Sequence, residues 1–428
     1  MSTTTKRNIA LISLGAFIWS IFFAIQGQYL NDYLADLSNF SPLIISLMVS
    51  LVALTGAIAS IIAGSVSDNL RSEFGRRKIF ILIGGTSSTL LFFLFPLGKS
   101  IAVIVGLNVA MNIMNTAAFV CNNSLIPDVT TNRKLGKTNA IALLGTSLGT
   151  VVGFAIMLLK SSSNVFFAAG AICSLGFLIV GLFFQEPKAD SQPKKWHVEI
   201  KNTFLLSNLK SEKNFFRFLI SHFLLHVGIN CYIPFLLIFL TQENNPASGE
   251  VIGLGLSLQN GQVLIIFTIM TVTSLLFTIP FGSLIDKTNN YKFLIISRTL
   301  FALTTGLFAL TPVFRNSNPM LIGALFIIPF SIANTADIIS RGALMHSLTP
   351  EGKRGQFIGL LYLVKTLAQI PGVIIGGLLA QFLQRGYQYS FLIGAIILII
   401  SIPFISSSSF KILNLKKLDE KLHQTHKG

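Results

Sequence analysis

Long apolar runs alternate with short polar loops along the whole chain of 428 residues. A helix needs about 20 mostly apolar residues to cross the hydrocarbon core of a bilayer. Some runs begin with a helix-start signal, such as Ser41 followed by Pro42, which suits an N-cap and the first helical position. The pattern predicts twelve spanning helices, at residues 9–30, 43–67, 79–97, 101–125, 139–159, 164–184, 217–240, 260–284, 292–312, 320–344, 357–383 and 388–408.

The composition fits a chain whose solvent is lipid. Hydrophobic residues make up 52% of the sequence and charged residues 11%, whereas a soluble domain carries about 25% charged residues. The net charge of +16 would suit nucleic acid if the basic residues formed a stripe, but they lie in short clusters between apolar runs. A nucleic-acid partner is therefore rejected, and a multi-pass protein of the cell membrane is expected.

The basic residues are concentrated on one side of the expected membrane. The two terminal segments and the loops on their side carry 25 Lys and Arg, while the opposite loops carry 4. Because cytoplasmic loops are enriched in Lys and Arg, this ratio predicts that both termini are cytoplasmic and that the number of spans is even. Three further basic residues, Arg298, Arg341 and Lys365, fall inside the expected spans.

A long basic loop divides the chain into two halves of six spans each. It contains Trp196, Ile200 and Phe204 at helical spacing among lysines, which is typical of an amphipathic helix lying on a membrane surface. The expected organisation is an N-terminal six-helix bundle at 1–184, a cytoplasmic linker at 185–216, a C-terminal six-helix bundle at 217–410 and a basic cytoplasmic tail at 411–428.

The two halves repeat each other. The stretch GSVSD at Gly64–Asp68 matches GSLID at Gly282–Asp286, at an offset of 218 residues. The tripeptide NTA at Asn115–Ala117 recurs at Asn334–Ala336, at an offset of 219. Landmarks in the same order and at nearly the same offset indicate a duplication. Parallel six-helix repeats are one architecture of secondary transporters, in which the substrate binds near the midplane between the halves.

The loop after the first landmark carries a motif. The pattern G-x-x-x-D followed by G-R-R-K, within Gly64–Lys78, resembles the loop between spans two and three of the major facilitator superfamily. Its longer form, D-x-x-R-S-x-F-G-R-R at Asp68–Arg77, is similar to that of sucrose/proton and related glycoside–cation symporters. The superfamily resemblance covers nearly the whole chain. It implies an all-α membrane protein with twelve transmembrane helices in two pseudo-symmetric six-helix bundles.

The same loop predicts a conformational latch that stabilises one access state of a transporter. Gly64 would allow close approach to a neighbouring backbone, Asp68 would bind an arginine or a helix N-terminus, and Gly75 would permit a tight reversal. The latch candidates are Gly64, Asp68, Arg71, Gly75, Arg76 and Arg77, with Asp286 in the second half. The alternative is a basic loop that only sets the orientation of the chain.

Ionisable residues inside the spans are the candidates for proton coupling, because such residues are costly in a membrane and mark ion pathways. Asp337 is the one carboxylate well inside a span, and Arg341 follows it at i+4 on the same helix face. Lys365 lies at a similar depth in the next span, so a Lys365–Asp337 pair is within reach. The alternative is a static ion pair that holds two helices together. Arg298, near the start of its span, is expected to snorkel to the interface.

Polar side chains within the spans are the substrate-binding candidates. Amide and phenol groups suit sugar hydroxyls because they both donate and accept hydrogen bonds, although they also bond between helices. His222, His226 and Asn230 follow at i, i+4 and i+8 on the first helix of the second half, with packing as the alternative role. The candidates are Gln26, Tyr29, Asn112, Asn115, His222, His226, Asn230 and Asn334.

Glycines recur at every fourth position in the fifth span. Gly145, Gly149 and Gly153 have the spacing that allows two helix backbones to approach closely. The spacing predicts close helix packing, and a seam along which helices slide during transport is the functional alternative.

Together these features predict a secondary active transporter that works by alternating access, with proton-coupled uptake of a sugar or glycoside as the leading function. Proton-coupled efflux of a drug or organic anion is the alternative, which Arg341 and Lys365 keep open. An enzyme is not expected, because the sequence has no phosphate loop, nucleophile elbow or metal cluster. No cofactor or metal is predicted. The expected partners of a monomer are a small-molecule substrate, a proton as coupling ion and the lipid bilayer.

Overall fold

The computed structural model describes residues 3–35, 41–70, 72–98, 100–129, 135–159, 161–186, 213–241, 255–287, 290–314, 318–348, 354–383 and 385–405. Within these residues the regular secondary structure is helical, without a strand. Helical segments lie at all twelve positions that the hydrophobic pattern predicts. The prediction of an all-α protein with twelve spans is therefore confirmed.

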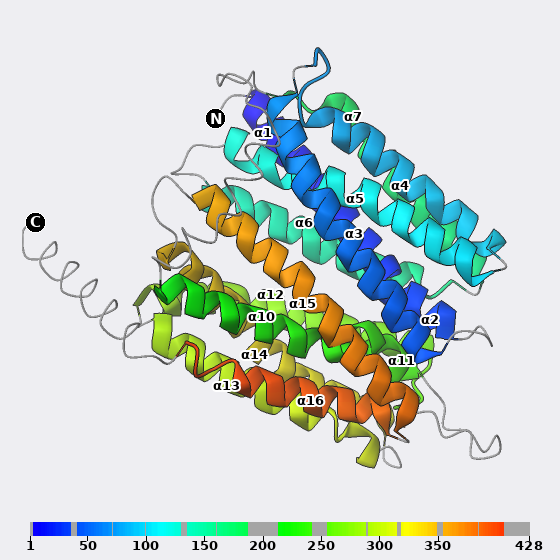
Figure 1. The fold of residues 1–428 in the computed structure, drawn as a ribbon, viewed down its shortest axis with the longest axis vertical. Helices are drawn as coiled ribbons and strands as arrows, with labels where there is room; N and C mark the ends of the chain where they lie inside the picture. Colours follow the sequence, from blue (N-terminus) through cyan, green and yellow to red (C-terminus); the bar gives the residue numbers. More distant parts are fainter. Residues whose placement is uncertain are drawn as a thin grey trace, which may run out of the picture. The chain divides into compact units, whose positions relative to one another are not determined.

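One compact unit consists of Met1–Thr203 and Gln259–Phe267 and holds the first six segments. Helices in it are capped and interrupted as the sequence suggests: Ser41 caps α3 through its hydroxyl, with Pro42 at the first helical position. In chain order (Figure 1) the elements are α1 (Thr3–Ala24), η1 (Ile25–Tyr29), α2 (Leu30–Ala35), α3 (Pro42–Asn69), η2 (Phe80–Gly85), α4 (Thr86–Leu90), η3 (Leu91–Leu97), α5 (Ile101–Val129), α6 (Leu135–Ile156) and α7 (Ser162–Phe183).

The other compact unit consists of Phe204–Leu258 and Thr268–Gly428. From the seventh segment onward the elements are α10 (Lys213–Tyr232), η5 (Ile233–Phe235), α11 (Leu236–Thr241), α12 (Asn260–Lys287), α13 (Asn290–Phe308), η7 (Thr311–Phe314), α14 (Pro319–Leu348), α15 (Arg354–Phe382) and α16 (Gly386–Ile400). Most of the expected linker, at 187–212, and the expected tail, at 411–428, lie outside the described residues.

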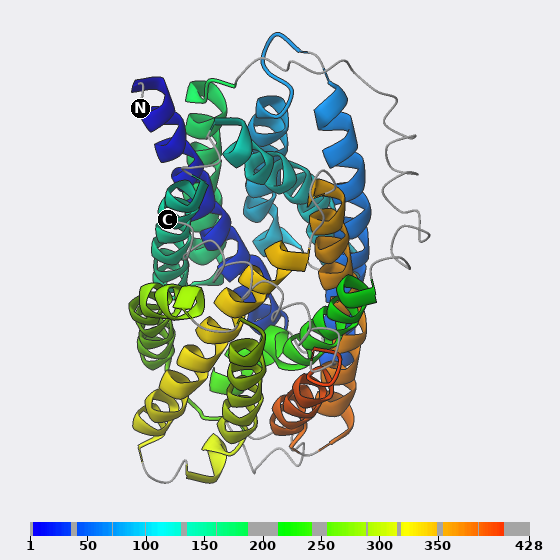
Figure 2. The same cartoon turned by 90° about the vertical axis from the view of Figure 1, so that its left-hand side faces the viewer.

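The same pairs of segments pack in both units, as the colours in Figure 2 allow the reader to follow. In the first unit α1 packs on α6 and α7, and the third segment (η2, α4, η3) packs on α7. In the second unit α10 packs on α15 and α16, and α13 packs on α16. In the first unit, packing thus joins the first segment to the fifth and to the sixth, and the third segment to the sixth. The same three pairings recur in the second unit, where the seventh segment packs on the eleventh and on the twelfth, and the ninth packs on the twelfth. The structure carries the duplication that the repeated landmarks indicate.

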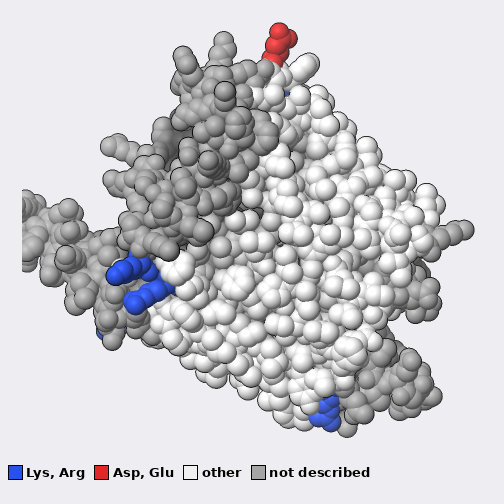
Figure 3. Space-filling model, in the orientation of Figure 1, with Lys and Arg blue, Asp and Glu red and all other residues white. Residues whose placement is uncertain are grey.

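The helices have the length and surface expected of a multi-pass membrane protein. Nine described helices are long and apolar enough to cross a membrane, and shorter apolar helices lie at Leu144–Ile156 and Gly386–Ile400. Large apolar side chains such as Leu47, Ile58 and Leu148 are more than half exposed, which suits contact with lipid rather than water. On the face drawn in Figure 3, the described Lys, Arg, Asp and Glu side chains lie at the margins.

Glycines set the closest helix approach in each unit. A Cβ at Gly149 would overlap the carbonyl oxygen of Phe17 on α1, and one at Gly376 would overlap the carbonyl oxygen of Cys231 on α10. The close packing predicted for the glycines of the fifth span is therefore confirmed. The eleventh segment uses the same device against the seventh, with Gly372 against the Val227 carbonyl.

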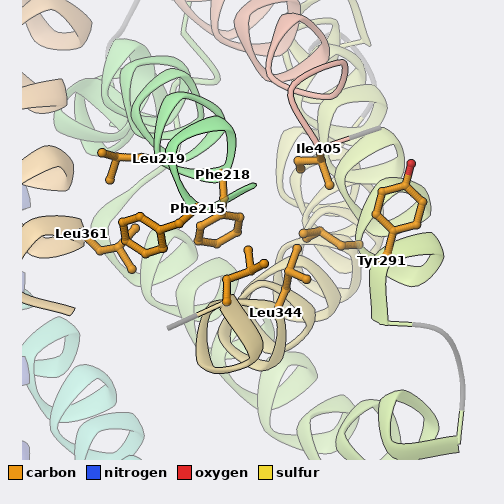
Figure 4. Packing of buried hydrophobic residues seen from close by; sticks show 9 residues of the cluster. Phe215, Phe218, Leu219, Tyr291, Leu344, Leu361 and Ile405 are labelled. Atoms are coloured by element: carbon orange, nitrogen blue, oxygen red, sulfur yellow. The ribbon is translucent and has the colours of Figure 1, made fainter. Parts of the chain in front are cut away.

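Buried apolar side chains fill one end of the second unit, where α10, α13 and α15 begin and α14 ends (Figure 4). Phe215 and Phe218 of α10 lie at the centre of this cluster in the close-up. We call it the apolar end layer; its members are Phe215, Phe218, Leu219, Tyr291, Leu294, Leu344, Leu348, Leu361 and Ile405.

Candidate functional site

Polar side chains form a second layer next to the apolar end layer. We call it the polar layer; its members are Ser221, His222, His226, Arg298, Asp337, Arg341, Lys365 and Ser401. Residues three or four apart share a helix face, and four such pairs join the layers: Phe218–His222, Leu294–Arg298, Arg341–Leu344 and Leu361–Lys365. The apolar end layer therefore separates the polar layer from the end of the unit at which α10, α13 and α15 begin.

Arg298 and Asp337 occupy the centre of the polar layer. Both side chains are 1% exposed, and Nε of Arg298 donates to Oδ1 of Asp337. Nη1 of Arg298 donates to Oγ of Ser401 at 2.9 Å and to Oγ of Ser221 at 3.3 Å. Ser221 in turn donates to the Ser401 carbonyl at 2.9 Å. Arg298 of α13 thus connects α10, α14 and the residue that follows α16.

Two expectations about these charges are wrong. Arg298 does not snorkel, because it lies eight residues after Asn290, the first residue of α13, which is about 12 Å along a helix, and finds a carboxylate at that depth. In the described part of the chain, Lys365 forms no ion pair with Asp337. The second partner of Asp337 is Arg341, with 3.7 Å between Oδ2 and Nε. One carboxylate is therefore shared by two arginines.

Arg341 connects Asp337 to the two histidines of α10. Its Nη1 lies 3.1 Å from Nε2 of His226. Because a guanidinium group has donors only, Nε2 accepts this hydrogen bond and the proton of the neutral ring is on Nδ1. The rings of His226 and His222 meet edge to face with centroids 4.6 Å apart. Asp337, Arg341, His226 and His222 are thus brought together, as their candidate roles require.

The remaining candidates of the second unit lie beside this group. The side-chain amide of Asn230 donates to the His226 carbonyl of its own helix at 2.7 Å. Asn334 is half-buried and precedes Asp337 by three residues on α14. Lys365 is exposed, and its positive charge acts on Arg341 and on both histidines. Lys365 is therefore within electrostatic range of the group without pairing with Asp337.

Polar candidates of the first unit bond to neighbouring helices. Nε2 of Gln26 donates to Oδ1 of Asn108 on α5 at 2.9 Å. Nδ2 of Asn112 donates to the Val52 carbonyl on α3 at 2.8 Å. Both bonds correspond to the interhelical role that amides commonly have in membrane proteins.

Asn115 and Tyr29 are also in contact with other segments of the first unit. Oδ1 of Asn115 accepts a hydrogen bond from the Ser88 hydroxyl at 3.5 Å. The ring of Tyr29 meets the ring of Phe166 edge to face, with centroids 5.6 Å apart. The first-unit candidates thus form separate interhelical contacts, whereas Asp337, Arg341, His226 and His222 of the second unit form one connected group.

Glu186, which the sequence analysis did not single out, holds the loop between the second and third segments. Its side chain is 4% exposed. Oε2 accepts the backbone N–H groups of Arg77 at 3.0 Å and Lys78 at 3.1 Å, and Oε1 lies 3.4 Å from Nε of Arg76. These N–H groups begin the third segment, where a carboxylate is favoured by the unpaired donors and the helix dipole. The available signal was an acidic residue directly after the sixth span.

The structure confirms the prediction for one latch candidate and contradicts it for another. Gly75 has a φ of 101°, which confirms the predicted tight reversal. The predicted close backbone approach at Gly64 is wrong, because a Cβ there would meet a Val120 methyl group at an ordinary 3.6 Å. Other latch candidates lie outside the described residues: the side chains of Asp68 and Asp286, and all of Arg71.

We expect Glu186→Ala to lower the thermal stability of the purified protein. Two backbone N–H groups would lose their acceptor and Arg76 would lose an ion-pair partner, and an unsatisfied buried donor costs about 1–3 kcal/mol. The measurement is the melting midpoint in detergent. Gln185→Ala is the matched control, because that side chain is exposed and its backbone carbonyl still accepts a hydrogen bond from Asn8 at 2.7 Å. Equal midpoints for the two variants would argue against a stabilising role of Glu186.

Two bacterial proteins are similar in sequence over nearly the whole chain. The multidrug resistance protein MdtG of Proteus mirabilis is 22% identical over 395 residues, which is 90% of each chain. The multi-drug resistance efflux pump PmrA homolog of Lactococcus lactis is 20% identical over 388 residues, which is 89% of each chain.

Solved transporter structures share the fold. A variant of the nucleoside transporter NupG has a TM-score of 0.74 at 15% identity and covers 96% of this chain and 100% of its own. A D-xylose-proton symporter has a TM-score of 0.67 at 17% identity and covers 93% of this chain and 96% of its own. The sequence model of the Major Facilitator Superfamily matches residues 9–244 and 218–420. The twelve helical segments, their duplicated packing and these matches show that the chain is a transporter of the Major Facilitator Superfamily.

Proposed function

We propose that the protein couples proton movement to the transport of a small molecule by alternating access, with Asp337 as the group that takes up and releases the proton. The observation that carries this proposal is the burial of Asp337 between Arg298 and Arg341. A carboxylate inside a membrane span is costly and is a functional group by default. Protonation of Asp337 would remove the charge that the two arginines share and free Arg341 for another partner.

Uptake of a sugar or glycoside is the first candidate for the transported class. The loop at Asp68–Arg77 resembles that of sucrose/proton and glycoside–cation symporters, and a D-xylose-proton symporter is among the similar structures. Side-chain amides such as those of Asn230 and Asn334 lie beside the polar layer and can both donate to and accept from hydroxyl groups.

Proton-coupled efflux of a drug or organic anion is the second candidate. It is favoured by the excess of positive over negative charge in the polar layer, where Arg298, Arg341 and Lys365 accompany Asp337. The names of the two similar bacterial proteins refer to multidrug resistance and to efflux, which supports transport out of the cell.

The proposal includes the setting of the transporter. A monomer lies in the cell membrane with both termini in the cytoplasm, because 25 Lys and Arg lie on that side. Its N-terminal bundle ends near 184, and its C-terminal bundle begins near 217. In this arrangement the loop at Gly64–Lys78, held by Glu186, stabilises one access state as a latch.

Uptake into proteoliposomes under an imposed pH gradient tests the proposal. Labelled glycosides and organic anions are compared for the unchanged protein, for Asp337→Asn and for Arg385→Gln, which removes an exposed charge outside the latch loop and the polar layer. We expect gradient-driven accumulation of at least one class, and we expect Asp337→Asn to reduce it to the equilibrium level while Arg385→Gln keeps it. Accumulation that is unchanged in Asp337→Asn would make the buried pair structural and contradict proton coupling through Asp337.

A further inference from the structure

The polar layer holds more positive than negative charge. Asp337 is bonded to Arg298 through Oδ1 and lies 3.7 Å from Arg341 through Oδ2. Both arginines therefore share this carboxylate. The Lys365 ammonium, which is exposed, adds a third positive charge, and among the described residues no carboxylate pairs with it. Three cations thus accompany one carboxylate in the polar layer, and this net positive charge suits the layer to receive an anion.

His222 provides a second and independent observation. Its side chain is 9% exposed, and Nδ1 has no hydrogen-bond partner within the described structure, although the Leu361 backbone interacts with the ring. Buried polar atoms without a partner are uncommon and require an explanation. Because the positive charges of Arg341 and Lys365 act on the same ring, the unpaired nitrogen lies where the excess charge is found.

We propose that Arg341, Lys365 and His222 form a binding site for an anionic group, a carboxylate or a phosphate, of the transported molecule. The inference rests on the proposed transport function and narrows its substrate class. A guanidinium group can bind such an anion through two parallel N–H donors. The Lys365 ammonium adds a further charged donor, and a protonated Nδ1 of His222 would donate as well.

Arg341 is the member of the layer that can exchange partners. Its side chain is 14% exposed, against 1% for Arg298, and the 3.7 Å from its Nε to Oδ2 of Asp337 is longer than a hydrogen bond. If Arg341 turns toward an anion, Asp337 keeps its bond to Arg298, so no buried carboxylate is left unpaired. Binding of the anion is therefore compatible with a stable buried pair.

The proposed site is expected to bind acidic substrates in preference to neutral ones. A neutral sugar would add no negative charge to a layer in which three cations accompany one carboxylate, whereas an acid would add one. A sugar acid has both the hydroxyl groups that suit Asn230 and Asn334 and the negative charge that suits the site.

Matched pairs of acid and amide test the site directly. The probes are D-glucuronate with D-glucuronamide and benzoate with benzamide, since the members of each pair differ in charge but little in shape. The full-length protein is titrated by calorimetry in nanodiscs of phosphatidylcholine, so that no lipid with a net negative charge competes. We expect at least one acid to bind about ten-fold or more tightly than its amide, the factor that a charge-assisted hydrogen bond provides.

Three charge-removing variants make the assignment specific. Arg341→Gln and Lys365→Gln are each expected to abolish the preference for the acid. Arg385→Gln is the matched control, because Arg385 is an exposed arginine of the same unit outside the polar layer, and we expect this variant to keep the preference. Melting midpoints of all variants show whether each is folded, and Arg341→Gln should fold because Asp337 retains Arg298.

The inference is overturned if acids and amides bind equally, if no probe binds, or if the preference survives in either Arg341→Gln or Lys365→Gln. These outcomes leave the proton-coupling test intact, because loss of gradient-driven accumulation in Asp337→Asn does not depend on the charge of the substrate. Conversely, a preference for acids together with unchanged accumulation in Asp337→Asn would support the anion site and reject coupling through Asp337.

Discussion

Arg298→Leu is expected to destabilise the protein more than any other single change in the polar layer. The variant leaves Asp337 buried at 1% exposure with Arg341 at 3.7 Å as its remaining ion-pair partner. It also removes the donor to the Ser221 and Ser401 hydroxyls. Removing one partner of a buried ion pair typically costs about 3–5 kcal/mol, which is comparable with the whole stability of many domains.

The double variant Arg298→Leu with Asp337→Leu is expected to recover much of that loss. Replacing both members of a buried pair with apolar groups is often neutral, because the cost of desolvating the two charges disappears. Melting midpoints and size-exclusion profiles of the single and double variants measure the effect, with Arg385→Leu as a control for loss of an arginine. A double variant no more stable than Arg298→Leu would contradict the pairing.

The position of the Arg298–Asp337 pair follows from the two layers around it. The apolar end layer keeps water away from one side, and a low local dielectric strengthens both the attraction and the penalty for an unpaired charge. The serine hydroxyls then satisfy the guanidinium donors that the carboxylate does not reach. Arg298 is therefore enclosed by its surroundings, while Arg341 lies at the more exposed side of Asp337, with 14% of its side chain exposed against 1% for Arg298.

The fold could be predicted from the sequence because lipid imposes simple rules on it. Each span needs a long apolar run, and the two repeated landmarks show the duplication without any structure. α13 is instructive, because it carries Lys292 and Arg298 within 19 residues and its apolar run at 292–312 still predicted a span. The described helices confirm all twelve positions, while the bounds of the linker depend on residues outside the described part.

The site could be predicted only in part, because sequence gives the depth of a residue in a span but not its neighbours on other helices. Asp337, Arg341 and His226 stood out because ionisable groups are rare inside spans. The partnership of Arg298 with Asp337 joins residues 39 positions apart on different helices, and a depth estimate alone favoured Lys365. Glu186 contacts a loop 109 positions away, so its place directly after the sixth span could not indicate which residues it binds.

Gly376→Ala is expected to destabilise the protein even though alanine favours helices. The added Cβ would overlap the Cys231 carbonyl oxygen and press on Phe235, and backbone atoms of a neighbouring helix cannot turn away as a flexible side chain can. Overpacking of this kind costs about 1–3 kcal/mol. Gly149→Ala should have a similar effect in the first unit, through the Phe17 carbonyl. The melting midpoint in detergent is the measurement.

Glycines with free space around them supply controls in which the effect has the opposite sign. A Cβ at Gly106 or Gly282 would meet no atom within 4 Å, so alanine there adds no clash and removes the conformational entropy of glycine, which is worth about 0.5–1 kcal/mol in a helix. We expect Gly106→Ala and Gly282→Ala to be neutral or stabilising, whereas Gly149→Ala and Gly376→Ala destabilise. If all four variants raised the midpoint, helix propensity rather than close packing would govern these positions, and the close contacts at Gly149 and Gly376 would have no structural role.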